Sequence, residues 1–294
     1  MGERPAGSPL PAKALAILAS LAAHRVLSTP QVQAIHSPST DPRWVQKLLV
    51  RLRAAGLADY VPSQGRGRLW FATERGARLA REAGALEGEP PPGAEIATGP
   101  LAAHTLALNE AAICFLRAAA ERGEDFGPLA WRHEVFHPIS RQRGKRRRSL
   151  VADAVFTYLR DDGEEIAIEQ RFLELDRATL SVDRLATELA RYGELYRAKE
   201  AKAREPLWRS RYPVFPRVHC VLTGAPRRAL ARRRSTTSVL LAADPLLSRT
   251  PEVAISICLL DDLRRDGPFA PVFREVRDPG QPVDWLGSPA EVVL

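Results

Sequence analysis

Residues 40–76, TDPRWVQKLLVRLRAAGLADYVPSQGRGRLWFATERG, specify the architecture of the N-terminal part of the chain. Pro42 follows a capping Thr40 or Asp41 and predicts the start of a helix. Gly56 predicts its end. Two apolar stretches then flank the turn-forming letters SQGRG, a pattern typical of two strands joined by a hairpin. A further helix follows the second strand. The pattern therefore predicts a small domain in which a hairpin lies between two helices.

The helix that starts at Pro42 separates apolar side chains from polar ones. Its inner face would consist of Val45, Leu48, Leu49, Leu52 and Ala55. Its outer face and flanks carry Arg43, Gln46, Lys47 and Arg51. A shorter helix is predicted upstream, because Ser28 or Thr29 can cap it and Pro30 suits its first position. A short helix followed by a longer basic one is typical of the helix-turn-helix, whose second helix enters the DNA major groove.

The hairpin adds a second set of cations. Arg66 and Arg68 lie at its glycine-rich tip, where they can contact DNA phosphates or the minor groove. The order of elements resembles the winged helix-turn-helix domains of bacterial regulators and replication proteins. We therefore predict a winged helix-turn-helix at 13–85 that binds double-stranded DNA through the cations of the hairpin and the long helix. The alternative is a winged helix used for protein contacts.

Charge and composition agree with this prediction. The chain has 294 residues, long enough for two domains, and a net charge of +8. Residues 1–85 hold 12 Lys and Arg against 5 Asp and Glu, which favours a polyanionic partner. The three cysteines lack paired spacing, and no apolar run is long enough to span a membrane. These features indicate a cytoplasmic protein without a membrane partner, and the abundance of Arg and Ala indicates a bacterial genome of high GC content.

Proline and glycine mark the expected boundaries. Residues 1–12 predict a flexible tail, and 86–99, with three consecutive prolines, predict a linker. Residues 100–294 are expected to form a mixed-sheet domain, so that the chain is α/β, or α+β overall. Its strands are predicted at 128–136, 150–159, 165–175, 217–223 and 252–258, and its helices at 100–121, 181–202 and 225–233.

Carboxylates interrupt two of these strands. LVADAVF at 150–156 contains Asp153, and FLELDRAT at 172–179 contains Glu174 and Asp176. Burying a charge is costly, so each acid should have a partner. Alternate residues of a strand share a face, so Glu174 and Asp176 point the same way, and Asp153 can reach Glu174 from a neighbouring strand. Two such carboxylates, with a phosphate and water, suit Mg²⁺ or Mn²⁺.

The second domain resembles the PD-(D/E)XK nuclease superfamily, which places Asp on one strand and Glu-x-Lys on the next. Asp153 and Glu174 stand at the acid positions, and Asp176 stands where the lysine would be. Glu110, on the preceding helix, matches a further acid that such folds often add. More narrowly, a winged helix followed by HTLALNE, DAVF, FLELDRAT and RLATELARY resembles the replication-relaxation family, which is linked to plasmid replication and DNA relaxation.

The resemblance implies catalytic roles for Asp153, Glu174, Asp176 and Glu110. It also implies that Asp153 and Glu174 bind the metal. The lysine is missing, and Glu188 stands on the next helix, from which related nucleases can supply one. We therefore expect an inactive or weakly active nuclease-like domain whose acids pair with Arg177, Arg184 and Arg191. The alternatives are a site-specific transcriptional regulator, whose second domain dimerises or senses a ligand, and an active Mg²⁺-dependent endonuclease.

A basic loop is predicted between the first two strands of the second domain. RQRGKRRRS, at 141–149, holds six cations in its first eight residues. We predict that Arg143, Lys145 and Arg146 contact the DNA backbone, and the alternative is a solvated loop. A homodimer is a further possible partner.

Overall fold

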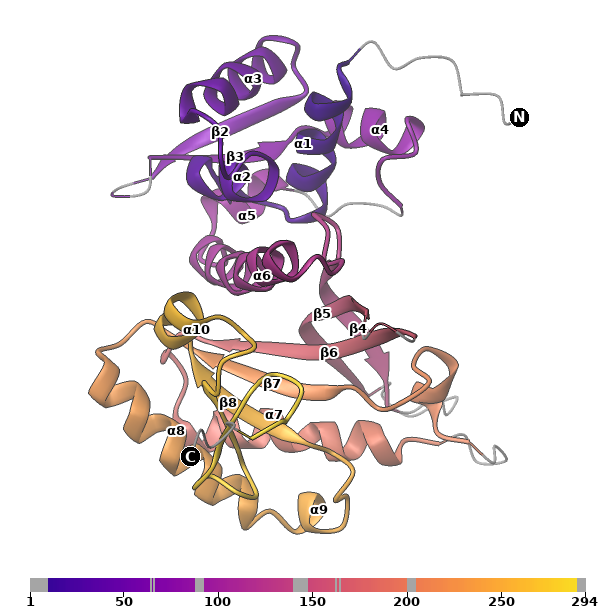
Figure 1. Cartoon of the computed structure of the whole chain (residues 1–294), viewed down its shortest axis with the longest axis vertical. Helices are drawn as coiled ribbons and strands as arrows, with labels where there is room; N and C mark the ends of the chain where they lie inside the picture. The colour runs from indigo at the N-terminus through magenta and orange to yellow at the C-terminus, as the bar shows by residue number, and fades with distance from the viewer. Residues whose placement is uncertain are drawn as a thin grey trace. The chain divides into compact units, whose positions relative to one another are not determined.

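The computed structural model describes residues 10–63, 65, 67–87, 93–139, 148–161, 163, 165–199 and 205–289. The chain divides into two compact units, Met1–Leu116 with Gly127–Leu129, and Arg117–Phe126 with Ala130–Leu294. Figure 1 shows the helices and strands of each unit. No helix in the described part of the chain is long and apolar enough to cross a membrane.

The first unit contains a three-stranded antiparallel sheet. Its strands are β1 (Leu27–Ser28), β2 (Ala58–Ser63) and β3 (Gly67–Ala72), in the order β1-β3-β2. Its helices are α1 (Ala12–Ala23), α2 (Thr29–His36), α3 (Pro42–Ala54), α4 (Glu74–Glu82), α5 (Gly93–Thr98) and α6 (Ala102–Arg122) up to Leu116. The succession α2, α3, β2, β3, α4 is that of a winged helix, which confirms the predicted order of elements.

Local contacts set where these helices begin. The Ser28 hydroxyl accepts a hydrogen bond from the backbone N–H of Gln31, whose side chain accepts one from the N–H of Ser28 in return. Asp41 caps α3 by accepting a backbone hydrogen bond of 2.8 Å from its first turn. Gly76 lets α4 approach the backbone just before β2, because a Cβ there would lie 1.9 Å from the carbonyl oxygen of Leu57. These contacts position the helices of the winged helix.

The boundary between the units differs from the predicted one. Residues 93–98 of the predicted linker form α5, whose Ile96 is buried in an apolar cluster with Val26, while residues 88–92 lie outside the described part. The predicted second domain includes α6, but most of this helix belongs to the first unit. There the fully buried Asn109 donates a hydrogen bond of 3.0 Å to the carbonyl oxygen of Val26. A proline-rich stretch interrupts regular secondary structure, but it does not prevent the helices that follow it from packing against the preceding core. Because the buried side-chain amide of Asn109 needs a hydrogen-bond partner, α6 packs with the winged helix.

The second unit is built around a seven-stranded sheet in the order β10-β9-β8-β7-β6-β5-β4. Its strands are β4 (Trp131–Pro138), β5 (Ser149–Asp161), β6 (Ile166–Asp176), β7 (Arg217–Leu222), β8 (Ile255–Leu259), β9 (Phe273–Glu275) and β10 (Pro282–Val283). Strands β6, β7 and β8 run parallel, and the other neighbours are antiparallel. Its helices are α7 (Val182–Arg197), α8 (Arg227–Ala242), α9 (Pro245–Ser248), α10 (Leu260–Asp266) and the 3-10 helix η1 (Leu207–Ser210). The sheet is mixed, which confirms the predicted fold class.

Helices α7 and α8 pack together and cover one face of this sheet (Figure 1). Phe172, Val218 and Ile257 contribute to the core beneath them. Because alternate residues of a strand share a face, Glu174 and Asp176 of β6 point to the same side as Phe172. The carboxylates of β6 therefore lie under α7 and α8. The opposite face of the sheet carries a buried aromatic cluster that includes Phe126, Trp131, Tyr158 and Trp285.

Helix α8 extends to Ala242, whereas the sequence predicts its end at residue 233. The letters STTS at 235–238 have low intrinsic helix propensity, which explains the early predicted end. In the structure Thr237 and Ser238 are buried, and Leu241 belongs to the apolar core. Tertiary packing therefore overrides the local preference.

Candidate functional site

The outer face of α3 is basic and exposed. The side chains of Arg43, Gln46, Lys47 and Arg51 are all exposed to solvent. On the opposite face Val45, Leu49 and Leu52 are buried in the core of the unit. The structure therefore presents the four predicted groove-facing side chains on one helix, with the apolar face holding that helix in place.

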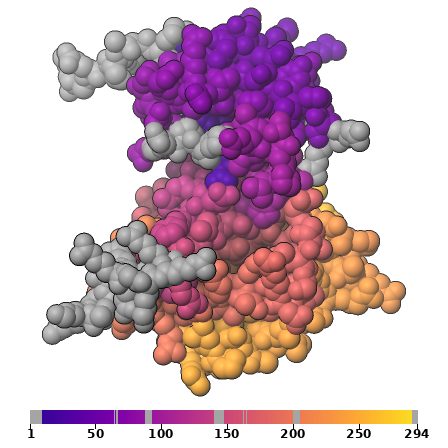
Figure 2. Space-filling model, turned by 180° about the vertical axis from the view of Figure 1, so that it is seen from behind, coloured from indigo at the N-terminus to yellow at the C-terminus, as the bar shows by residue number. Residues whose placement is uncertain are grey.

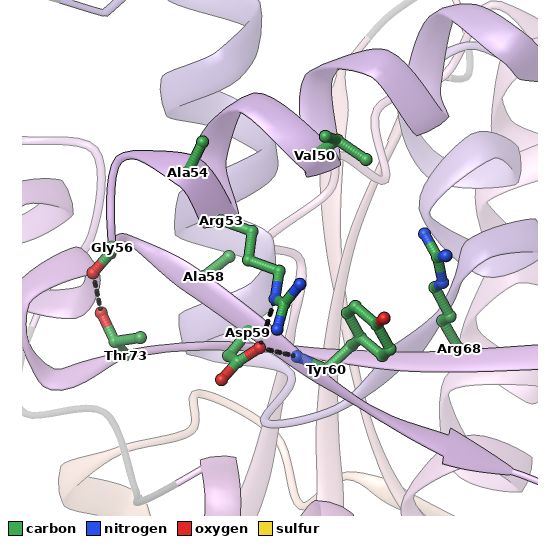
Figure 3. Close-up of a pocket in the computed structure, with 9 residues that line it drawn as sticks. All are labelled: Val50, Arg53, Ala54, Gly56, Ala58, Asp59, Tyr60, Arg68 and Thr73. Carbon is green, nitrogen blue, oxygen red and sulfur yellow. Dashed lines mark hydrogen bonds and ion pairs between the residues drawn. The ribbon is translucent and has the colours of Figure 1, made fainter.

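Tyr60 of β2 lies between two arginines, Arg53 of α3 and Arg68 of β3 (Figure 3). The guanidinium carbon of Arg53 lies 4.7 Å from the centre of the Tyr60 ring, and that of Arg68 lies 4.6 Å from it. Arg53 also donates a hydrogen bond of 2.8 Å to Asp59, which holds the pKa of that carboxyl below its ordinary value. With Val50, these side chains line a groove of about 520 Å³.

Arg68 differs from Arg53 in its charge balance. Asp59 offsets the charge of Arg53, whereas Arg68 is exposed and contacts no acid among the residues that the structure describes. An uncompensated guanidinium held on an aromatic ring is a suitable donor to a phosphate. Sequence reasoning did not assign a role to Tyr60. The other cations predicted to contact DNA, Arg66, Arg143, Lys145 and Arg146, lie outside the described residues.

Asp153 and Glu174 are neighbours across β5 and β6. The ladder pairs Ala154 with Leu173, so Asp153 and Glu174 follow at the next position. One oxygen of Asp153 accepts a hydrogen bond of 2.8 Å from the backbone N–H of Leu175. The Tyr192 hydroxyl of α7 donates to Glu174. Burial, and then the charge of Asp153, raise the pKa of Glu174 well above its ordinary value of 4.5. Glu174 therefore retains its proton more readily than an exposed glutamate does.

Asp176 pairs with an arginine that the sequence analysis did not select. Arg233 of α8 donates through Nε and Nη2 to both carboxylate oxygens, with an Nη2–Oδ1 distance of 3.0 Å. The pair is buried, since the side chains of Arg233 and Asp176 are only 10% and 3% exposed. Two parallel hydrogen bonds between charged groups give a strong and directional contact.

The arginines predicted as partners of the acids lie elsewhere. Arg184 pairs with Glu188 on the same helix at 3.4 Å, and Arg191 donates to the carbonyl oxygen of Ser149. The expected pairing of Asp176 with Arg177, Arg184 or Arg191 is therefore wrong. The physical reason is that parallel strands require a crossover connection, which brings α8, 57 residues further along the chain, over β6.

Glu110 belongs to the first unit, unlike the other predicted catalytic acids. Its carboxylate accepts a hydrogen bond of 3.4 Å from the side chain of Gln31, which also donates to the carbonyl oxygen of Leu106 at 2.7 Å. The segment HTLALNE therefore connects α6 to α2 within the winged helix unit. Its catalytic role stays a prediction.

In this arrangement the acids of the second unit are engaged by protein groups. Mg²⁺ prefers several oxygen ligands in a near-octahedral geometry. No group of three or more His, Cys, Asp or Glu side chains in the described ranges is placed to hold a metal ion. Asp153 and Glu174 each use an oxygen in a hydrogen bond, and Asp176 uses both with Arg233. Binding of Mg²⁺ or Mn²⁺ therefore stays a prediction.

Removing the cation from the buried pair should destabilise the second unit. Arg233→Met leaves Asp176 buried without a counter-charge, which should lower the free energy of unfolding by about 3–5 kcal/mol. Adding Asp176→Leu should restore most of this loss, because an apolar pair replaces an ionic one. Arg232→Met, at an exposed position of the same helix, should change stability by less than about 0.5 kcal/mol. Urea denaturation measures all three, and equal losses in both arginine variants would contradict the assignment.

The raised pKa of Glu174 makes stability depend on pH. A carboxyl group whose pKa is raised by folding contributes stability that is fully present below its ordinary pKa of 4.5 and is lost as pH rises through the raised pKa. Glu174→Gln keeps an acceptor for Tyr192 but cannot ionise. Its melting temperature should therefore fall less with rising pH than that of the wild type. Thermal unfolding across a pH series tests this, with the exposed Glu205→Gln as control, and identical pH profiles for wild type and Glu174→Gln would refute it.

Comparison with known proteins gives one family match and some remote structural similarities. The repressor MarR, of Multiple Antibiotic Resistance, is 18% identical, with 39% of this chain and 77% of that chain covered and a TM-score of 0.24. ZitR, a zinc-responsive MarR family member of Lactococcus lactis, is 20% identical, with 42% and 83% covered and a TM-score of 0.25. Protein VC1899 from Vibrio cholerae is 12% identical, with 88% and 55% covered and a TM-score of 0.33. These low scores support no functional argument, and no curated protein matches.

The family match covers most of the chain. The model described as Replication-relaxation matches residues 18–208, from within α1 to within η1. The matched range includes the winged helix, the segment HTLALNE, and the strands that carry Asp153, Glu174 and Asp176. The chain therefore belongs to the replication-relaxation family.

Proposed function

We propose that the protein binds double-stranded DNA through its winged helix and acts in the replication or relaxation of plasmid or mobile-element DNA. The main support is the exposed basic face of α3, with the uncompensated Arg68 on the adjacent hairpin. The family of the chain gives the replication context. The second unit, in this proposal, is a nuclease-like scaffold that does not cleave DNA.

In this proposal the two elements of the first unit make different contacts with DNA. Helix α3 enters the major groove, where Gln46 and Lys47 face base edges and Arg43 and Arg51 contact phosphates. The hairpin lies along the backbone, where Arg68 donates to a phosphate or enters the minor groove. Tyr60 supports this role, because its ring holds the Arg68 guanidinium in position and reduces the entropy lost on binding.

Three observations support an inactive scaffold. The position of the superfamily lysine holds Asp176, an acid that cannot supply the positive charge with which a lysine stabilises a transition state. The carboxylate of Asp176 is itself occupied by Arg233. Glu174, with its raised pKa, is a poor ligand for a metal ion until it loses its proton.

Removing cations from the winged helix should weaken DNA binding in a salt-dependent way. Each phosphate contact contributes about 0.9 to the slope of log affinity against log salt, so the Arg51→Ala, Arg68→Ala double variant should reduce the slope by up to about 2. Fluorescence anisotropy with a labelled duplex measures this slope. Arg78→Ala, an exposed cation on α4 of the same unit, serves as the control and should keep the wild-type slope. An unchanged slope in the double variant would exclude α3 and the hairpin as the DNA contact.

The second unit should not cleave DNA. The wild-type chain should nick supercoiled plasmid no faster in Mg²⁺ or Mn²⁺ than in chelator, because Asp176 stands at the lysine position and the described residues form no metal site of three or more ligands. Gel analysis of plasmid topology tests this with Asp153→Ala and Glu174→Ala, and with the exposed Asp161→Ala on β5 as control. Metal-dependent nicking that only the first two variants abolish would show an active nuclease. A metal-dependent rise in melting temperature without nicking, lost in the same variants, would show a metal site without catalysis.

A further inference from the structure

We propose that α8 forms a second contact with nucleic acid, which binds the phosphodiester backbone. The contact would be the outer face of α8, made of Arg228, Arg232, Ser235 and Thr236, all of which are exposed. Their spacing places them on one side of the helix. Guanidinium and hydroxyl groups are the side chains that most often donate to DNA phosphates.

The five arginines of α8 differ in their partners and in their exposure to solvent. Arg227 pairs with Asp262 and the largely buried Arg233 pairs with Asp176, whereas burial lowers the pKa of the partly buried Arg234. Arg228 and Arg232 contact no acid among the residues that the structure describes. Two exposed guanidiniums, one helical turn apart, are therefore available to a ligand.

The positive charges in the first turn of α8 are unfavourable for the helix itself. Helix α8 starts after Pro226 with no side-chain cap and no acid in its first turn, where it carries Arg227 and Arg228. Cations near the positive end of a helix dipole are unfavourable. On the same face of the sheet, α7 shows the ordinary arrangement, with Ser181 as cap and Asp183 in its first turn. An anionic ligand on the outer face of α8 would offset this repulsion.

The composition of the outer face favours a phosphodiester over a protein partner. Protein interfaces depend on apolar or aromatic anchors at their centre, and this face has none over its first three turns. The exposed Val239 lies beyond it, toward the end of the helix. Helix α8 lies at the surface of its unit, in the orange part of the chain in Figure 2. The choice of DNA as the ligand rests on the proposed function of the winged helix.

Salt titration of the full-length chain with labelled duplex DNA tests the proposal. The Arg228→Ala, Arg232→Ala variant should lower the slope of log affinity against log salt by up to about 2, for two lost phosphate contacts. The control is Arg197→Ala, Arg249→Ala, which removes the same charge from exposed positions elsewhere in the second unit. It should keep the wild-type slope. Circular dichroism confirms that each variant is folded.

The outcomes separate this inference from the proposed function. A wild-type slope in the α8 variant, or an equal decrease in the α8 and control variants, overturns the α8 contact whatever the winged helix does. A decrease in the α8 variant alone supports it, even if the Arg51→Ala, Arg68→Ala variant leaves binding unchanged and the proposed function fails. Polyglutamate and vesicles with anionic lipid serve as competing probes. If either displaces the duplex from wild type but not from the α8 variant at equal charge, the ligand is not specifically a phosphodiester and the proposal falls.

Discussion

The buried ion pair between Asp176 and Arg233 determines how the second unit can be assembled. A charged group inside a protein needs a counter-charge or a change in protonation, and β6 carries two carboxylates on one face. Asp176 has a guanidinium from α8, whereas Glu174 has a raised pKa and a hydrogen bond from Tyr192 of α7. The two helices that cover the sheet are therefore fixed to β6 by directional polar contacts in addition to apolar packing.

The same contacts bear on the nuclease-like scaffold that we propose for the second unit. A nuclease of the superfamily that the sequence resembles needs ionised acids open to a metal and a lysine beside them. In this chain Asp176 stands at the lysine position, and both of its carboxylate oxygens accept hydrogen bonds from Arg233. The neighbouring Glu174 lies beside Asp153, whose charge helps to raise the pKa of Glu174. Burying these charges costs free energy, but the resulting ion pair fixes the position of α8 over the sheet. Structure and catalysis would thus compete for the same carboxylates.

Much of the winged helix follows from its sequence, because its signals are local. The caps of α2 and α3 lie within a few residues of the groups they bond, and the faces of α3 follow from helical spacing. The neighbourhood of Asp153 and Glu174 also follows, since β5 and β6 are consecutive antiparallel strands. Arg233 could not be found in this way, because α8 is one of many arginine-rich segments and reaches β6 only through the crossover between parallel strands. For the same reason the low helix propensity of residues 235–238 gave the wrong end for α8.

The hydrogen bonds of Asn109 and Gln31 have a consequence for how this protein can be divided or recombined. They make α6 a supporting helix of the winged helix, although the proline-rich segment that precedes it has the appearance of a natural junction. A gene fusion joined at those prolines would separate the winged helix from α5 and α6, which support it, and would expose Val26 and Ile96. The boundary between the two units therefore lies inside α6, near Leu116. To exchange either unit, the chain would have to be joined within this helix and not within a loop.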